Sequence, residues 1–498
     1  MKKDKVVLLN IISNFILQFV TILSGFIMPK LILNNFGSEV NGLVSSVGQF
    51  LNYISLLEGG ISGVIMAAFY KPLFNKDNSK ISSILNTTKH FFRKIAYIFI
   101  IYSLIVAFVY PLIAKTSFSY IYLITLVLIM SFGLFMQYHF SLALKLLLNA
   151  DKKVYIVSFT QSIIFVLNIF LAIVSLYIYP SIHVIKMISA LLYIVQPIVF
   201  NHFIKKYFII DSSLKEDNSL IKQRWDGFAI NIAYFIHANT DVFLLTVLSD
   251  IKLVSVYSIY KLVVNGLTQT IKSITSAIMP NIGHLYAKGN IEELNEKFNT
   301  YEFFNFFAVG FLFTVAGLLI TPFVMIYTKN ITDINYYEPL FGIVLVVAEL
   351  MYVLKSPHLS LAYSANMFKK MKIPAYLEAV INIAVSIVLI NYLGLLGIAI
   401  GTLVAMTYRT IYQVYFLKNH ILNRKLSIFL KKFIVFGVSS LVGICISLYL
   451  IPTVDYSIFS WIIAGITYSL IILLIYFISS MIFYKKEILY LKNYLLKK

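Results

Sequence analysis

The chain has 498 residues, of which 60% are hydrophobic and only 12% are charged, and its mean hydropathy is +0.86. About a quarter of the residues of ordinary soluble proteins are charged, so a soluble chain of this length could not bury so much apolar surface. The net charge of +20 would suit nucleic acid, but no polar segment is long enough to fold into a basic domain. A single cysteine excludes an internal disulfide and a cysteine-rich metal site. Composition therefore predicts an all-α polytopic membrane protein.

About 20 apolar residues cross a bilayer as a helix, and the chain holds about fourteen such runs. In chain order they are 8–33, 40–68, 95–114, 119–146, 155–178, 182–204, 228–249, 252–285, 303–327, 338–365, 375–393, 396–418, 430–451 and 457–483. The first run follows a basic start like that of a signal peptide. Because no small-residue cleavage site follows it, we expect it to be retained as a span.

The distribution of Lys and Arg predicts the orientation, because cytoplasmic loops are enriched in these residues. With the N-terminus inside, eight inner segments hold 32 of the 41 Lys and Arg residues, the outer segments hold four, and five fall within spans. We therefore expect both termini to be cytoplasmic. The positive charge then lies on the inner face, where anionic membrane lipids are the expected partners and nucleic acid is not.

The runs 40–68 and 252–285 are the least apolar, and each carries a polar stripe at helical spacing. The stripe members are Asn41, Ser45, Gln49, Asn52, Ser55 and Ser62 in the first run and Tyr257, Lys261, Asn265, Thr268, Lys272 and Thr275 in the second. The offset of 212 residues between them is that of two six-helix repeats. Polar groups facing lipid tails are costly, so both stripes face protein or water. Interhelical hydrogen bonding is the simpler explanation for the Ser and Thr residues.

Four basic residues lie deep within predicted spans, where each costs about 3 kcal/mol on insertion scales. They are Lys261, Lys272, Lys355 and Arg409. The deep acids are Asp241 and Glu349 in the same half of the chain and Glu58 in the second run. An ion pair between Asp241 and Lys261 would give both a structural role. The remaining excess of positive charge would attract an anion such as a pyrophosphate.

Motifs of enzymes are not found in the sequence, which has neither metal-binding His or Cys spacing nor a Gly-rich phosphate loop with its lysine. We therefore predict a non-enzyme without metal or cofactor, driven by an H⁺ or Na⁺ gradient or by the membrane potential. Asp241, Glu349 and Glu58 are the candidates for ion coupling. A polar run at 237–241 interrupts one span, as at transporter sites, although a histidine holding a kink explains it equally well.

Four segments resemble bacterial polysaccharide repeat-unit flippases, the Wzx-type members of the multidrug/oligosaccharidyl-lipid/polysaccharide (MOP) exporter superfamily. They are FGSEVNGLVSSVGQFLNYISLLEGG (36–60), AAFYKPL (67–73), FIHANTDVFLLT (235–246) and YLEAVINIAVSIVLINYLGLLGIAIGTLVAMTYRT (376–410). They are distributed over most of the chain, and they are structural signatures rather than catalytic ones.

The resemblance implies two six-helix lobes that face each other in a V, as in MATE transporters, and two peripheral C-terminal helices. The expected parts are 1–204 (spans 1–6), 205–227 (cytoplasmic loop), 228–420 (spans 7–12), 421–484 (spans 13–14) and 485–498 (basic cytoplasmic tail). Alternating access would carry an undecaprenyl-pyrophosphate-linked oligosaccharide across the bacterial plasma membrane for capsule, exopolysaccharide or O-antigen biosynthesis. A polysaccharide polymerase would be a further partner.

Within this resemblance, the four deep bases are the expected contacts of the pyrophosphate or of acidic sugars. Asn41, Gln49, Asn52 and Asn265 are the expected contacts of sugar hydroxyls. A lipid II or teichoic-acid precursor flippase stays open, as do a MATE-type drug or cation antiporter and a scaffold that transports nothing. The positive excess favours an anionic substrate over a cationic drug.

Overall fold

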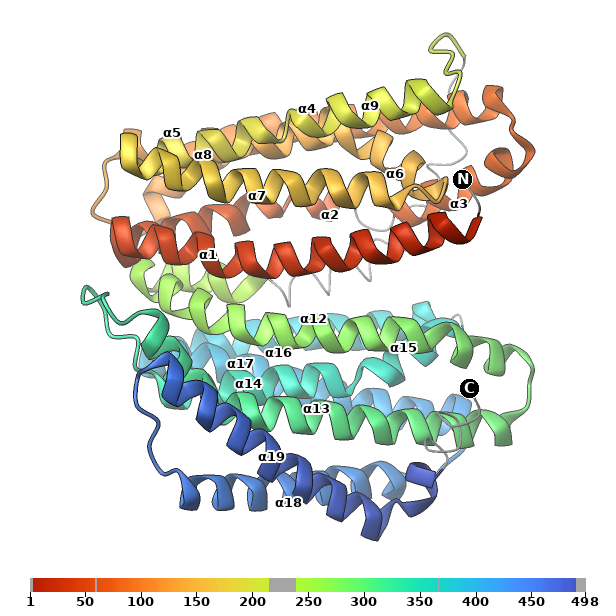
Figure 1. Cartoon of the computed structure of the whole chain (residues 1–498), viewed down its shortest axis with the longest axis vertical. Helices are drawn as coiled ribbons and strands as arrows, with labels where there is room; N and C mark the ends of the chain where they lie inside the picture. Colours follow the sequence, from red (N-terminus) through yellow and green to blue (C-terminus); the bar gives the residue numbers. More distant parts are fainter. Residues whose placement is uncertain (1–2, 59–60, 215–238, 366, 490–498) are drawn as a thin grey trace. The chain divides into compact units, whose positions relative to one another are not determined.

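The computed structural model describes residues 3–58, 61–214, 239–365 and 367–489, which form helices joined by short connections and contain no strand. The helices in chain order are α1 (Lys3–Asn52), α2 (Ser55–Glu58), α3 (Ile61–Asn75), α4 (Asn78–Ile113), α5 (Tyr120–Met136), the π-helix η1 (Gln137–Ser141), α6 (Leu142–Ala150), α7 (Val154–Ile178), α8 (Ile182–Leu192), α9 (Val195–Tyr207), a short helix at Asn239–Leu248, α12 (Ile251–Ala287), α13 (Ile291–Tyr327), α14 (Pro339–Leu354), α15 (Ser356–Ser364), α16 (Phe368–Leu393), α17 (Leu395–Leu417), the π-helix η2 (Lys418–Leu422), α18 (Ser427–Leu450) and α19 (Ile458–Phe483). Figure 1 shows their course.

Eleven helical segments in the described residues are long and apolar enough to cross a membrane, so the chain is a multi-pass membrane protein. Three expected spans are not among them as separate helices. The run 40–68 is divided among α1, α2 and α3. The run 228–249 begins outside the described residues, and 252–285 forms the more polar, 37-residue α12. Fourteen spans and cytoplasmic termini stay predictions.

The described residues form two compact units, 1–255 and 256–498, which divide within α12. The lobe limits predicted from the sequence stay a prediction. Most of the expected inter-lobe loop, from 215 onward, and most of the basic tail, from 490 onward, lie outside the described residues.

In unit 1, α1 is the longest helix and lies beside α7 (Figure 1). Polar side chains connect the two, since Ser158 Oγ donates to Asn14 Oδ1 at 2.7 Å and the backbone N–H of Tyr155 donates to Asn10 Oδ1 at 2.9 Å. Helical geometry breaks once inside α1, at Gly37, where φ is 81°. A glycine tolerates this positive φ without strain, so two helical stretches follow one another across a kink at Gly37 with no loop between them.

In unit 2, α16 and α17 form a tight helical hairpin that turns at Gly394, where φ is 55°. The two helices approach so closely that a Cβ atom at Gly401 would lie 2.1 Å from Ser386 Oγ, and one at Gly397 would lie 2.5 Å from the Leu389 carbonyl oxygen. Small residues spaced four apart allow such backbone approach in membrane helices. The hairpin is therefore specified by its glycines.

We expect Gly401→Ala to destabilise the protein by about 1–3 kcal/mol, because the added methyl has no room between the helices. Thermal unfolding of the purified protein measures the loss. Gly437→Ala on α18 is the matched control, since no atom lies within 4 Å of the corresponding Cβ position. Equal midpoints for the two variants would contradict close packing at Gly401.

The helices α18 and α19 pack against α13 (Figure 1), and a buried ionic cluster joins α18 to α13. Glu302 of α13, which is 1% exposed, accepts from Lys432 Nζ at 2.7 Å, from Arg424 Nη1 at 2.9 Å and lies 2.8 Å from His358 Nε2. These bases come from α18, from the η2–α18 link and from α15. Helix α18 and the link before it therefore share a charged core with α13 and α15.

Glu302→Gln should lower the free energy of unfolding by about 3–5 kcal/mol, because it leaves Arg424 and Lys432 buried without their counter-charge. Glu296→Gln, earlier on the exposed face of α13, is the control. The thermal midpoints of both variants test the prediction, and an unchanged Glu302→Gln midpoint would refute it.

Candidate functional site

Helix α12 carries a polar stripe on one face, which Lys261, Asn265, Gln269 and Lys272 form at spacings of four, four and three residues. Asn265 and Gln269 are exposed and the two lysines are half-buried. Exposed polar groups along a membrane-length helix lie against water rather than lipid, because lipid would impose the full cost of desolvation. Three of these residues are predicted from the sequence, and Gln269 is new.

Lys261 forms an ion pair with Glu349 of α14, and the carboxylate side chain is 3% exposed while that of Lys261 is 14% exposed. Thr268, two turns along α12, donates to the other carboxylate oxygen of Glu349 at 3.3 Å. The predicted partner Asp241 belongs to unit 1, and its pairing with Lys261 stays a prediction.

Lys355 and Arg409 share a second buried carboxylate, Glu378 of α16. Lys355 Nζ donates to one oxygen at 3.1 Å, and Arg409 Nε lies 3.3 Å from the other. Both bases are at most 3% exposed. Glu378 is not among the deep acids predicted from the sequence. It is the fourth residue of the run 375–393, and a carboxylate so close to the start of a span can reach water. In the structure it is 7% exposed and pairs with both bases.

Tyr352 lies between Lys272 of α12 and Lys355 of the second ion-paired group. Its ring centroid lies 4.8 Å from Lys272 Nζ and 4.7 Å from Lys355 Nζ, distances at which an ammonium group is attracted to an aromatic face. Tyr352 follows Glu349 by three residues on α14 and precedes Lys355 by three, so all three occupy one side of the helix. Tyr352 carries no charge and lies in an apolar helix, so the sequence does not predict it as a site residue.

The four predicted bases thus belong to one group, which we call the cationic cluster. Its members are Lys261, Lys272, Glu349, Tyr352, Lys355, Glu378 and Arg409. Four bases and two carboxylates give it a formal charge of +2. An excess charge of this size in a medium of low dielectric constant creates a strong local attraction for anions.

The predicted sugar-contacting residues of unit 1 have different environments. Asn41 is 2% exposed and donates to Ser255 Oγ at 2.7 Å, which is an interhelical bond. Gln49 Oε1 is buried and accepts no hydrogen bond from the described residues, whereas Asn52 is exposed at the end of α1. Their contact with a substrate stays a prediction.

Two predicted coupling acids also lie in unit 1. Glu58 accepts from Ser62 Oγ at 2.8 Å and has Tyr138 Oη 3.5 Å from its other oxygen. Asp241 is 2% exposed near the start of the helix Asn239–Leu248. Among the described residues, no three His, Cys, Asp or Glu side chains gather as a metal site would require.

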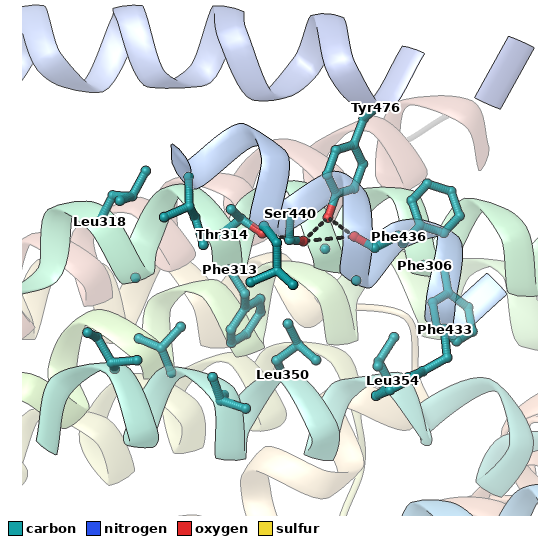
Figure 2. A pocket seen from close by; sticks show the side chains of 18 of the residues that line it. Phe306, Phe313, Thr314, Leu318, Leu350, Leu354, Phe433, Phe436, Ser440 and Tyr476 are labelled. Carbon is teal, nitrogen blue, oxygen red and sulfur yellow. Dashed lines mark hydrogen bonds between the residues drawn. The ribbon is translucent and has the colours of Figure 1, made fainter. Parts of the chain in front are cut away.

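A separate apolar cavity of about 460 Å³ lies between α13, α14, α18 and α19. Figure 2 shows Phe313, Leu350 and Phe433 lining it. The polar groups of the lining are hydroxyls that bond one another, such as Ser440 Oγ and Tyr476 Oη, which lie 2.6 Å apart and join α18 to α19. The lining carries no charged side chain, so the cavity is not a candidate for anion binding.

Comparisons with known proteins agree on the fold. The sequence matches no family model and no curated protein sequence. The structure is similar to that of the lipid II flippase MurJ in an inward closed conformation, with a TM-score of 0.71, 17% identity, and coverage of 97% of this chain and 100% of that chain.

Two transporters of the MATE family are also similar. An inward-facing MATE family transporter of the MOP superfamily has a TM-score of 0.60 and 14% identity, and the match covers 80% of this chain and 95% of that one. The MATE multidrug transporter DinF-BH has a TM-score of 0.61 and 17% identity, and the match covers 85% of this chain and 98% of that one. The chain therefore has the fold of MOP-type membrane flippases and transporters. Among these three proteins, MurJ matches the largest share of it.

Tyr352→Leu should expose the Lys272 amine, because the ring that attracts it is lost. At about 1 kcal/mol for one such contact, labelling of Lys272 by an amine-reactive reagent should accelerate about fivefold. Mass spectrometry of the labelled, folded protein measures the rate. Tyr352→Phe keeps the ring and should label like wild type, with exposed Lys288 as the internal reference. A Phe variant that labels as fast as the Leu variant would exclude a role for the aromatic face.

Proposed function

We propose that the protein is a flippase that moves an undecaprenyl-pyrophosphate-linked oligosaccharide repeat unit from the inner to the outer leaflet by alternating access. The observation that carries the proposal is the cationic cluster, with its charge of +2 beside an exposed polar stripe on α12. The similarity of 97% of the chain to a lipid II flippase supports the same class of substrate.

The two kinds of base have different parts in this proposal. Lys261 and Lys272 are partly exposed on the stripe, so they contact the pyrophosphate directly. Lys355 and Arg409 are buried on Glu378, so they contribute an electrostatic field without touching the substrate. Asn265 and Gln269, which are exposed on the same face of α12, donate to sugar hydroxyls. Amide side chains suit this task because they offer both donors and acceptors.

The energy source in the proposal is an H⁺ or Na⁺ gradient or the membrane potential. Moving a pyrophosphate group outward transfers negative charge in the direction that an inside-negative potential favours, by about 2.3 kcal/mol per charge at 100 mV. Asp241, Glu58 and Glu349 stay the candidates for ion coupling.

Lipid II is the second candidate substrate, because MurJ matches nearly the whole chain. It carries the same pyrophosphate, so the cationic cluster serves either substrate. A MATE-type exporter of cationic drugs is less favoured, since the excess charge of the cluster repels a cation.

The proposal is tested by complementing a bacterial host that lacks its repeat-unit flippase. Wild type should restore surface polysaccharide. Lys261→Ala and Lys272→Ala, at matched expression, should each reduce it about tenfold or more, since each removes a charged contact to phosphate. Lys288→Ala, an exposed lysine directly after α12, is the matched control.

Full restoration of surface polysaccharide by both Lys261→Ala and Lys272→Ala would show that the function does not depend on the cationic cluster. If wild type restores nothing in this host or in one depleted of its lipid II flippase, and instead lowers the accumulation of a cationic dye, the protein is a drug exporter and the proposal is wrong.

A further inference from the structure

Glu349 occupies the position that an incoming anion would need. Its carboxylate pairs with Lys261, one of the two partly exposed bases of the stripe. An ammonium group on a single side chain has three donors and one charge, so a phosphate that approaches Lys261 competes with a carboxylate already in place. The protein therefore carries its own competitor for the anion.

The surroundings of Glu349 permit this exchange. A buried carboxylate that loses its only partner is strongly destabilised, but Glu349 has two further sources of stabilisation. Thr268 donates to its second oxygen at 3.3 Å, and the charge of Lys355, about one and a half turns along α14, also acts on it. When an anion takes Lys261, both of these interactions remain.

We propose that Glu349 is a displaceable counter-anion. Its ion pair with Lys261 breaks when the pyrophosphate of the substrate binds Lys261, and the pair forms again when the substrate leaves. This inference rests on the proposed function and adds a mechanism of release. A transporter must bind its cargo well enough to select it and weakly enough to let it go. When Glu349 pairs with Lys261 again, the affinity of the protein for its substrate falls, which favours release.

The exchange predicts opposite effects for the two members of the pair. Glu349→Gln removes the competitor, so purified full-length protein in nanodiscs should bind undecaprenyl pyrophosphate about tenfold more tightly. Release should slow, so the same variant should restore less surface polysaccharide in the complementation assay. Lys261→Gln should weaken binding, and the double variant should bind like Lys261→Gln, because the proposed competition between Glu349 and the anion takes place at Lys261. Glu296→Gln is the exposed control and should bind like wild type.

Unchanged or weaker binding by Glu349→Gln, with wild-type binding intact, would overturn the exchange while leaving the proposed function in place. A wild type that does not bind undecaprenyl pyrophosphate would instead reject the proposed function. If Glu349→Gln does not fold, Glu349→Asp keeps the charge and withdraws the carboxylate by one methylene group. Glu349→Asp should bind undecaprenyl pyrophosphate more tightly than wild type, by a smaller factor than Glu349→Gln. Unchanged or weaker binding by Glu349→Asp would also contradict the proposed exchange.

Discussion

Glu378 is shared by two buried bases, and much of unit 2 is arranged around this ionic contact. A charge removed from water is tolerated only beside an opposite charge with good hydrogen bonds. Lys355 comes from the junction of α14 and α15, Arg409 from α17, and Glu378 from α16. One carboxylate therefore fixes the lateral positions of three helices. Because it neutralises only one of its two partners, the group also retains a positive charge.

The surplus charge is connected to the exposed face of α12 through an aromatic ring rather than through another acid. Tyr352 contacts one buried and one half-buried lysine. An aromatic ring attracts a cation without cancelling its charge, whereas a carboxylate in the same place would make the cluster more neutral. The packing of the cluster thus preserves its attraction for anions. Glu349, on the same side of α14, is the member whose charge opposes that attraction at the half-buried Lys261.

Helical spacing and the cost of burying a charge were sufficient to predict much of this from the sequence. The stripe on α12 follows from residues three and four apart, and the four deep bases follow from the rarity of charge inside spans. Glu378 was missed because it lies near a span end, and Tyr352 because an aromatic residue in an apolar helix ordinarily indicates packing. The division of the run 40–68 among α1, α2 and α3 could not be predicted either, since hydropathy does not show where one helix ends and the next begins.

The Glu302 cluster could not be predicted from the sequence for a different reason. Its partners are far apart in the chain, and no local pattern connects them. Arg424 and Lys432 follow Glu302 by 122 and 130 residues. No period or motif relates residues at such a separation. The peripheral place of the last two helices, which the resemblance to known flippases implies, stays a prediction, and within unit 2 a base of α18 lies against a fully buried acid of α13.

That separation has a consequence for the order in which the protein is made. Helices are synthesised from the N-terminus onward, so α13 reaches the membrane before the arginine and lysine that will meet its carboxylate exist. At ~5–20 residues per second, the 122 residues to Arg424 take roughly 6–24 s to translate. During that interval Glu302 is a carboxylate without its two permanent cations. A chain interrupted before Arg424 would keep a carboxylate in α13 without these two cations, so the C-terminal part of the chain is needed to complete the charge balance of a helix made much earlier.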